Sequence, residues 1–373
     1  MGKRLILAGG GTGGHIYPAL AIGTGILSRW PASELLYVGG SRGLESRLAP
    51  ASGFEFAGIP AAGWQGRTPA NLARALAITW QGRAEAGEIL RRFRPEAVIC
   101  TGGYACLPTA AAAWQARIPV YLHEQNAFPG LASRLIARWA ASLLLTFPEA
   151  AAYFPRRARQ RITVTGLPVR PEIGRASREA ALAFFGWDPT GLTILAAGGS
   201  QGAKSLNQAM LDVIKQFYRQ KETRILLAAG SRDYEWLTNT LGEAGITWGG
   251  QENIRVEPYI DRMDLAYAAG DIFVGRSGAS TLAEIASCGL PGILIPYPYA
   301  AGDHQTRNAQ SLADKEAAIL LPETGLTGPA LTRTLAGLLS DGEKRRRMAA
   351  NSAAAAKPQA LADILAILAP VMA

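Results

Sequence analysis

Residues 4–23 read RLILAGGGTGGHIYPALAIG, and this stretch carries most of the information about the fold. A short apolar run precedes a glycine-rich turn, and the pattern then predicts a helix that begins near Ile16 to Pro18. Residues 192–211, LTILAAGGSQGAKSLNQAML, repeat this order of apolar run, paired glycines and helical segment. Each half of the chain is therefore predicted to begin with its own strand, loop and helix, which indicates two similar domains.

Other apolar runs alternate with alanine-rich helical segments, as expected for parallel strands that are buried on both faces. The predicted strands cover residues 35–38, 97–100, 119–122, 142–145, 224–229, 271–274 and 292–296. Helices are expected around residues 206–217 and 282–288. The fold class predicted from these segments is α/β, with two open, doubly wound parallel sheets.

The chain of 373 residues is longer than the roughly 250–300 residues at which a single core usually stops growing. Two prolines and a glycine interrupt the stretch TGLPVRP at residues 165–171, and we place the domain boundary there. The predicted domains are residues 1–167 and 168–345, with helices at 346–373 that return to the N-terminal domain. Ligands of such sheets lie outside the carboxyl ends of the strands, so the expected active site is a cleft between the domains.

The composition excludes several classes of protein. Hydrophobic residues make up 49% of the chain and charged residues 18%, which is typical of a folded globular protein. Three widely spaced cysteines show no zinc-binding spacing and are expected in a reducing compartment. No secretory signal or membrane-spanning run is expected, and no nucleic-acid-binding module is found. The net charge of +9 favours anionic ligands or surfaces.

The first glycine-rich loop, Gly9 to Gly14, satisfies the dinucleotide pattern GxGxxG. The next predicted strand ends in glycines and lacks the acidic residue that would hold a ribose, which argues against a dehydrogenase. The loop at residues 198–202 resembles a phosphate loop, but Ala203 separates its last glycine from Lys204, which argues against an NTPase.

Four such loops, at residues 9–14, 102–104, 198–202 and 277–281, follow apolar runs and precede helices. Backbone amides at a helix start attract anions, so the loops indicate a phosphate or pyrophosphate ligand. Of the three histidines, His15, His123 and His304, the first directly follows one of these loops. A neutral imidazole there could act as a general base, although a lone histidine is more often structural.

Several motifs occur in an order that resembles one enzyme family over nearly the whole chain. They are GGGTGGHIYPALAI, GGYACLPTAAAA, IPVYLHEQNAFPGLASR, GGSQGAKSLN, YIDRM, RSGASTLAEIASCGLP and PYPYAAGDHQTRNA. On these motifs the chain resembles the MurG family, which transfers N-acetylglucosamine from UDP-N-acetylglucosamine to the muramyl sugar of lipid I and forms lipid II for the bacterial wall. The resemblance implies a GT-B fold, in which two Rossmann-like domains face each other.

The resemblance also implies a set of donor-binding residues. Ile260 is expected at the uracil, Glu284 at the ribose, and Arg170 and Ser200 at the diphosphate. Gln305, beside His304, is expected at the sugar hydroxyls. Backbone amides are expected from Ala279, Ser280, Thr281, Leu282, Ala283 and Glu284, and the opposite domain is expected to close the donor pocket with Thr12, Gly13, Gly14 and Asn126.

The implied reaction inverts the anomeric centre, since the acceptor 4-hydroxyl attacks the sugar and UDP leaves. We expect His15 to be the general base, with Glu124 and Tyr104 as helpers on the acceptor side, although Glu124 could itself be the base. No Asp-x-Asp sequence occurs, so helix dipoles and Arg170 are expected to stabilise the leaving diphosphate, with no metal and no cofactor.

The segment from Trp64 to Arg94 combines aromatic, aliphatic and basic side chains, a composition that suits a bilayer interface or an ordinary amphipathic helix. Its members are Trp64, Leu72, Leu76, Ile78 and Trp80 with Arg67, Arg74, Arg83, Arg91 and Arg92. The family is peripheral to the cytoplasmic membrane face, which favours membrane contact. The alternatives are another enzyme of the same fold, such as a UDP-N-acetylglucosamine 2-epimerase or a lipid glycosyltransferase, and a nucleotide-sugar-binding module without turnover.

Overall fold

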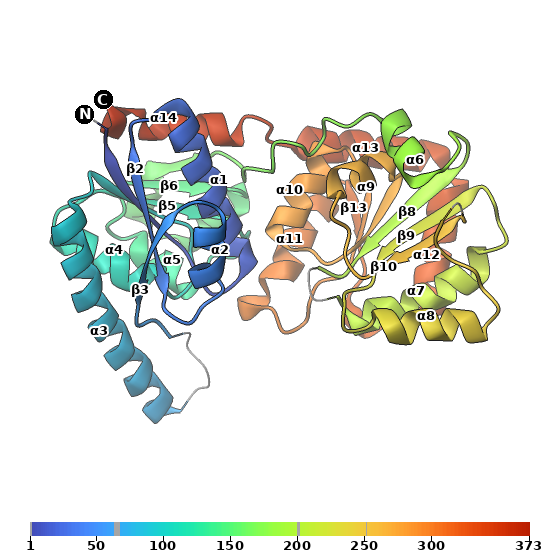
Figure 1. Ribbon diagram of the computed structural model, residues 1–373, viewed down its shortest axis with the longest axis horizontal. Coiled ribbons are helices and arrows are strands. Elements are labelled where there is room, and N and C mark those ends of the chain that lie inside the picture. Colours follow the sequence, from blue (N-terminus) through green and yellow to red (C-terminus); the bar gives the residue numbers. More distant parts are fainter. Residues whose placement is uncertain (1, 63–67, 200–201, 251) are drawn as a thin grey trace. The chain divides into compact units, whose positions relative to one another are not determined.

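The computed structural model describes residues 2–62, 68–199, 202–250 and 252–373 (Figure 1). The chain forms two compact units. Unit 1 comprises Met1–Val169 and Lys357–Ala373, and unit 2 comprises Arg170–Ala356. The chain therefore passes from unit 1 to unit 2 between residues 169 and 170 and returns to unit 1 between residues 356 and 357. The boundaries predicted from the sequence were 167/168 and 345/346.

Unit 1 is built on a parallel sheet in which the described residues form seven strands, in the order β3-β2-β1-β4-β5-β6-β7. The strands are β1 Arg4–Ala8, β2 Glu34–Gly40, β3 Glu55–Ile59, β4 Ala97–Cys100, β5 Val120–Glu124, β6 Ser142–Leu145 and β7 Ile162–Val164. The order reverses between β1 and β4, so the loops that follow these two strands flank a topological switch point, where α/β sheets bind ligands.

The apolar character of β1 explains why both faces of this sheet are covered. Leu5 and Leu7 belong to one buried cluster, and Ile6 and Ala8 belong to another. Successive side chains of a strand point to opposite faces, so the two clusters lie on opposite sides of the sheet. A strand that is buried on both faces reads as a continuous apolar run, which confirms the parallel, doubly wound prediction.

The helices of unit 1 follow the strands. They are α1 Gly13–Arg29, α2 Glu45–Ala51, α3 Pro69–Phe93, α4 Cys106–Gln115, α5 Leu131–Ile136 and α14 Ala360–Met372, with the 3₁₀ turns η1 Pro148–Tyr153 and η2 Arg156–Arg161. The predicted start of the first helix was wrong by three residues or more. Thr12 is extended, with φ −138° and ψ 157°, and the helix begins at Gly13. His15 therefore lies within the first helical turn and not in the preceding loop.

The C-terminal helix belongs to unit 1. Figure 1 shows α14 beside α1, and the Leu361 side chain packs closely against Gly25. Ile364 and Leu368 of α14 are fully buried in the same cluster as Leu5 and Leu7. The preceding helix, α13 Gly342–Ala355, belongs to unit 2. The chain turns at Ala356, which is extended, and Pro358 disfavours helical backbone at Lys357.

Residues 342–372 have the length and mean hydropathy of a helix that could cross a membrane, which the sequence analysis did not expect. In the structure the segment is divided into α13 and α14, which pack against α10 and α1. One such segment is weak evidence of a span, since helices of soluble proteins share this length and composition.

Unit 2 has its own parallel sheet, in which the described residues form six strands in the order β10-β9-β8-β11-β12-β13. The strands are β8 Leu192–Ala197, β9 Thr223–Ala228, β10 Ile254–Glu257, β11 Ile272–Gly275, β12 Gly292–Leu294 and β13 Ala318–Leu320. The helices are α6 Arg178–Phe185, α7 Lys204–Phe217, α8 Tyr234–Glu243, α9 Met263–Ala269, α10 Ala279–Ser287, α11 His304–Ala313, α12 Gly328–Ser340 and α13, with the 3₁₀ turns η3 Ala301–Asp303 and η4 Glu323–Gly325.

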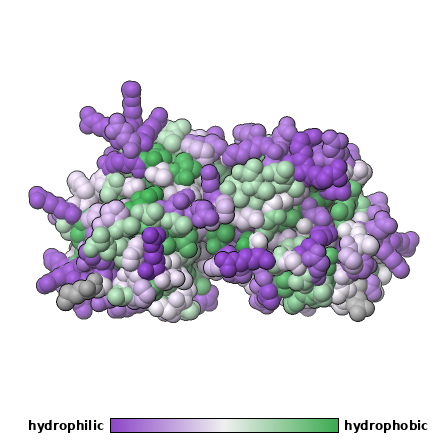
Figure 2. Space-filling view, turned by 90° about the horizontal axis from the view of Figure 1, so that it is seen from above, coloured by the Kyte–Doolittle hydropathy of each residue, from purple (hydrophilic) through white to green (hydrophobic). Residues whose placement is uncertain are grey.

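The surface carries the charged and polar side chains, and the three cysteines form no disulfide, as the composition predicted. In Figure 2, hydrophilic side chains project from the surface of each unit, with hydrophobic ones between them. Cys100 and Cys106 are buried, Cys288 is partly exposed, and all three are free thiols.

Candidate active site

Two loops of unit 1 meet at the carboxyl edge of its sheet. The loop after β1 runs from Gly9 to Thr12, and the loop after β4 runs from Thr101 to Ala105. Gly103 has φ +83°, and a Cβ atom at this position would lie 2.0 Å from the carbonyl oxygen of Gly10. The two backbones touch here, so a side chain is excluded on both conformational and steric grounds.

His15 lies where these loops meet. Its Nδ1 atom is 3.0 Å from the carbonyl oxygen of Thr101 and 3.0 Å from Oε1 of Gln125. The Thr101 hydroxyl donates to the backbone carbonyl of His15 at 2.7 Å. Three contacts thus fix both the backbone and the ring of His15, while Nε2 forms no hydrogen bond within the described residues.

His123 lies on the neighbouring strand β5 and is fully buried. Its Nε2 atom is 2.9 Å from the carbonyl oxygen of Gly166, and its Nδ1 atom is 3.0 Å from Nε2 of Gln125. Burial lowers the pKa of His123 to about 4, and the hydrogen bond to Gly166 offsets only part of that effect. His123 is therefore neutral at physiological pH.

Glu124 ends β5 and is almost fully buried. Its Oε1 atom accepts from the backbone amide of Asn126 at 3.0 Å and from the Asn126 side chain at 3.3 Å. Its Oε2 atom is buried and has no hydrogen-bond partner within the described residues. A buried carboxylate oxygen without a partner is costly, which is typical of an atom that meets a ligand or a proton donor in the working protein.

The other predicted residues of unit 1 lie beside these groups. Tyr104 is partly buried, and burial, with a smaller effect of Glu45, raises the pKa of its hydroxyl. Thr12 is exposed at the start of α1, and Gly13 and Gly14 follow in its first turn. The phenol of Tyr104 therefore remains protonated at neutral pH. Its ring lies beside Gly11, where an added Cβ atom would be 2.8 Å from Cε1 of Tyr104.

Glu45 was not predicted. It is fully buried, and its carboxylate accepts from the amide of Gly40 at 2.8 Å and from the amide of Gly11 at 3.2 Å. It thus connects the end of β2 to the first glycine-rich loop. A glutamate at the start of a helix is common, so the sequence carried no signal for this contact.

In unit 2, the start of α10 follows β11. Gly278 is the N-cap and has no side chain to satisfy the helix-start amides. The amide of Leu282 already bonds to the carbonyl oxygen of Gly278 at 3.0 Å. The free amides of this helix start are therefore those of Ala279, Ser280 and Thr281, and Leu282 and Ala283 lie beyond it.

Glu284 lies one turn further along α10. Arg170 binds its Oε1 atom, with Nε and Nη2 each at 3.1 Å, and the hydroxyl of Tyr267 donates to its Oε2 atom at 2.9 Å. Burial lowers the pKa of Arg170, but the combined effect of Glu284, Glu172 and Tyr267 raises it above its usual value. The structure therefore joins two predicted donor residues directly. Tyr267, on α9, was not among the predicted residues, because no motif surrounds it.

The remaining predicted donor residues are dispersed over the loops of unit 2. Gln305 lies in the first turn of α11, where its Oε1 atom accepts from the amide of Tyr297 at 3.0 Å. His304, beside it, bonds through Nδ1 to the carbonyl oxygen of Ala301 at 2.9 Å. Ile260 is buried in the loop between β10 and α9. Ser200 lies outside the described residues.

A polar network connects the loops of unit 2. Arg276 follows β11, and its guanidinium bonds to Glu323 and, at 3.3 Å, to the hydroxyl of Ser205. Ser205 also donates to Glu323 at 2.6 Å. Ser205 lies in the first turn of α7, which follows the glycine-rich loop at residues 198–202, so the network holds the start of this helix.

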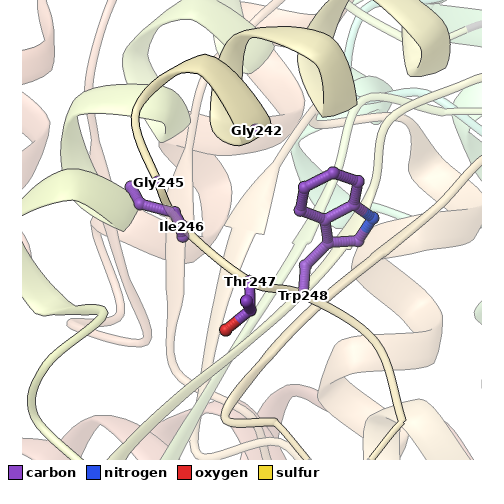
Figure 3. Close-up of a pocket in the computed structure, with 5 residues that line it drawn as sticks. All are labelled: Gly242, Gly245, Ile246, Thr247 and Trp248. Atoms are coloured by element: carbon purple, nitrogen blue, oxygen red, sulfur yellow. The ribbon is translucent and has the colours of Figure 1, made fainter.

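A shallow pocket of about 330 Å³ lies elsewhere in unit 2, between α8 and β10 (Figure 3). Its lining consists of Gly242, Gly245, Ile246, Thr247 and Trp248. Figure 3 shows the indole of Trp248 beside the end of α8. These five lining residues include no charged side chain and no predicted site residue. Within the described ranges, no group of three or more histidine, cysteine or acidic residues is placed to hold a metal.

Comparison with known proteins places these features in a family. Residues 5–145 match the glycosyltransferase family 28 N-terminal domain, and residues 193–364 match the glycosyltransferase family 28 C-terminal domain. The UDP-N-acetylglucosamine–N-acetylmuramyl-(pentapeptide) pyrophosphoryl-undecaprenol N-acetylglucosamine transferase of Desulforudis audaxviator is 46% identical, over 98% of this chain and 97% of that protein.

Solved structures agree with this result. The crystal structure of Acinetobacter baumannii MurG is similar with a TM-score of 0.79 and 26% identity, over 99% of each chain. The crystal structure of a putative UDP-N-acetylglucosamine 2-epimerase from Listeria monocytogenes shares only the fold, with a TM-score of 0.70 and 14% identity over 99% of this chain and 96% of that chain. The chain is therefore a glycosyltransferase of the GT-B fold and belongs to the MurG family.

Proposed function

We propose that this protein transfers N-acetylglucosamine from UDP-N-acetylglucosamine to the 4-hydroxyl of the muramyl sugar of lipid I, and that UDP leaves with inversion at the anomeric carbon. Full-length similarity to transferases with this activity supports the substrates. The reaction needs a base for the acceptor hydroxyl and positive potential for the departing diphosphate.

Unit 2 is proposed to bind the donor. Free amides at the start of α10 carry partial positive charge and suit the diphosphate. Arg170 can bind phosphate oxygens with two parallel hydrogen bonds, and the Glu284 carboxylate can accept from ribose hydroxyls. Both groups are paired with each other in the structure. Donor binding would therefore exchange this ion pair for contacts with the nucleotide. Ile260, Gln305 and Ser200 complete the proposed donor set.

Unit 1 is proposed to bind and activate the acceptor. His15 has a fixed ring and an unengaged Nε2 atom, so it can accept the proton of the attacking hydroxyl. Glu124 and Tyr104 assist it, and Thr12, Gly13, Gly14 and Asn126 remain proposed donor contacts from this unit. The observation that carries the proposal is the buried Oε2 atom of Glu124, which has no hydrogen-bond partner among the described residues and lies on the strand next to the His15 loops, because it marks this sheet edge as a place for a polar ligand.

A transfer assay tests the proposal: the purified protein is incubated with UDP-N-acetylglucosamine and a lipid I analogue in the presence of a chelator. We expect a disaccharide product that requires the acceptor and does not require divalent metal. Transfer that appears only after metal is added would contradict the metal-free mechanism. Epimerisation of the donor without transfer, or donor binding without turnover, would contradict the function itself.

We also propose that α3 and α4 contact an anionic membrane at its cytoplasmic face. Leu76 and Trp80 on α3 are 61% and 67% exposed, and Trp114 on α4 is 60% exposed. The two helices pack against each other, and the guanidinium of Arg83 lies 4.1 Å from the ring centre of Trp80. Exposed aromatic rings beside cations suit the interfacial region of a bilayer. Trp64 and Arg67 lie outside the described residues.

Vesicle sedimentation tests this second point. Trp80→Ser should reduce binding to phosphatidylglycerol vesicles about tenfold, since an exposed indole would lose its burial in lipid. Trp236→Ser, which removes an exposed tryptophan from α8 in unit 2, is the matched control and should leave binding unchanged. Equal effects of both variants would contradict the assignment to α3.

A further inference from the structure

The hydrogen bonds of His15, Gln125 and His123 form one continuous chain. It runs from the carbonyl of Thr101 through His15, Gln125 and His123 to the carbonyl of Gly166. Both ends of the chain are backbone carbonyl oxygens, which only accept hydrogen bonds. The direction of every intermediate bond can therefore be worked out from the ends.

The Gly166 end fixes His123. Because the Gly166 oxygen accepts, Nε2 of His123 must carry hydrogen. A neutral imidazole carries one hydrogen, so Nδ1 of His123 holds a lone pair and must receive its bond from Gln125. The Gln125 nitrogen also donates to the carbonyl of His123 at 3.1 Å, which again requires the amide NH₂ to face this way.

The Thr101 end independently fixes His15. Because the Thr101 oxygen accepts, Nδ1 of His15 must carry hydrogen, and the amide oxygen of Gln125 accepts from the same atom. The two ends therefore demand the same orientation of the Gln125 amide. The opposite orientation would bring a donor to a donor at His15 and an acceptor to an acceptor at His123.

We infer that Gln125 and His123 are positioning residues that hold His15 with hydrogen on Nδ1 and an unshared pair on Nε2. This inference deepens the proposed function and rests on it, since a base must present a lone pair to the acceptor hydroxyl. Gln125 is almost fully buried and His123 is fully buried, so water does not compete for these bonds. The arrangement selects the working tautomer before substrate binds.

The absence of a side chain at Gly102 leaves space for the hydrogen bond between His15 and Gln125. Gly102 has φ +94°, and a Cβ atom there would lie 2.8 Å from Nδ1 of His15 and 3.5 Å from Oε1 of Gln125. The glycine therefore leaves room for the bond between His15 and Gln125.

Side-chain nitrogen NMR of the ¹⁵N-histidine-labelled, full-length protein tests the inference directly, since the chain has only three histidines. His304→Gln and His123→Gln assign the signals. We expect a protonated Nδ1 and an unprotonated Nε2 for His15, with the reverse for His123. A protonated Nε2 on neutral His15, or a protonated Nδ1 on neutral His123, overturns the inference.

Matched variants test the positioning role. Gln125→Met keeps the length of the side chain but removes both bonds, and we expect it to shift the His15 nitrogen signals toward a mixture of tautomers. It should lower kcat about tenfold and change the KM for UDP-N-acetylglucosamine less than twofold, because misplacing a base affects the chemical step. Unchanged signals and unchanged kcat in a folded Gln125→Met protein overturn the role of Gln125.

Two substitutions at His123 separate its two bonds. Asn can replace Nδ1 as the acceptor from Gln125, whereas Gln can replace Nε2 as the donor to Gly166. His123→Asn should therefore retain more of kcat than His123→Gln, and the reverse order overturns the role of the Gln125–His123 bond. If the tautomers are as expected but His15→Gln keeps wild-type kcat, the base assignment under the proposed function fails while the tautomer assignment stands.

Discussion

Arg170 and Glu284 are 114 positions apart in the sequence, yet the guanidinium Nη2 of Arg170 lies 3.1 Å from the Glu284 carboxylate. The Glu284 side chain is 14% exposed and that of Arg170 is 45% exposed, so the pair is accessible to a ligand. In the absence of a nucleotide, Arg170 and Glu284 provide each other with a hydrogen-bond partner of opposite charge. This relationship explains how a partly buried carboxylate can be kept ready for a ribose without a large desolvation cost.

Glu284→Gln should raise the KM for UDP-N-acetylglucosamine about tenfold or more. A hydrogen bond to a charged group contributes about 1.5–3 kcal/mol, and the amide accepts less strongly from ribose hydroxyls. Steady-state kinetics measures the change. Glu172→Gln is the matched control, since Glu172 also faces Arg170 but at 3.9 Å and in a more exposed position. Equal KM values for the two variants would rule out a special role for Glu284.

Glu124→Gln should lower kcat at least about tenfold and leave binding of UDP unchanged. The substitution preserves the size of the side chain but removes the charge of the buried, unpartnered Oε2 atom. Single-turnover transfer to a lipid I analogue measures the chemical step. Glu55→Gln, at an exposed position on β3, serves as the control. Wild-type kcat in Glu124→Gln would remove Glu124 from the acceptor machinery.

Acid should destabilise unit 1 through His123. The pKa of His123 is about 4 in the folded state and 6.5 in an unperturbed histidine, so the unfolded chain binds more protons between these values. The free energy of unfolding should therefore fall as the pH drops from 6.5 to 4, by about 3 kcal/mol from this group. Hydrogen exchange of β5 amides across this range measures the loss. His123→Gln should lose this part of the pH dependence and His304→Gln should keep it.

Gly102→Ala should lower kcat more than an equally strained substitution elsewhere. Gly102 and Gly53 both have positive φ, of +94° and +82°, so alanine costs about 1–2 kcal/mol of backbone strain at either site. A methyl group at Gly102 would approach His15, whereas no atom of the described residues lies within 4 Å of a methyl group at Gly53. Thermal melting should therefore show that Gly102→Ala and Gly53→Ala are both destabilised. Transfer assays should show a lower kcat for Gly102→Ala alone. Equal rates would show that the space beside His15 is not needed.

The sequence predicted the strands well where their signal is local. β4 and β6 have the predicted bounds, because runs that are buried on both faces consist of consecutive apolar residues. The edge strands β3, β7, β10 and β13 were missed. The three or four residues of β7, β10 and β13 give little periodicity to detect, and the sequence of β3, EFAGI, includes a charged residue and a glycine. The early start of α1 was missed because Gly13 and Gly14 are poor helix formers, and only their place at an N-terminus makes them acceptable.

The α/β class, the twin strand–loop–helix starts and the family could all be predicted from the amino-acid sequence, because each of these depends on residue order along short stretches. Which side chains meet follows instead from the three-dimensional fold. Arg170 with Glu284, Glu45 with the first glycine-rich loop, and His15 with Gln125 are pairs whose members are far apart in the sequence, and hydrogen bonds between such residues leave no periodic mark on it. The direction of the bonds from Thr101 to Gly166, and with it the tautomer of His15, follows only from that three-dimensional arrangement.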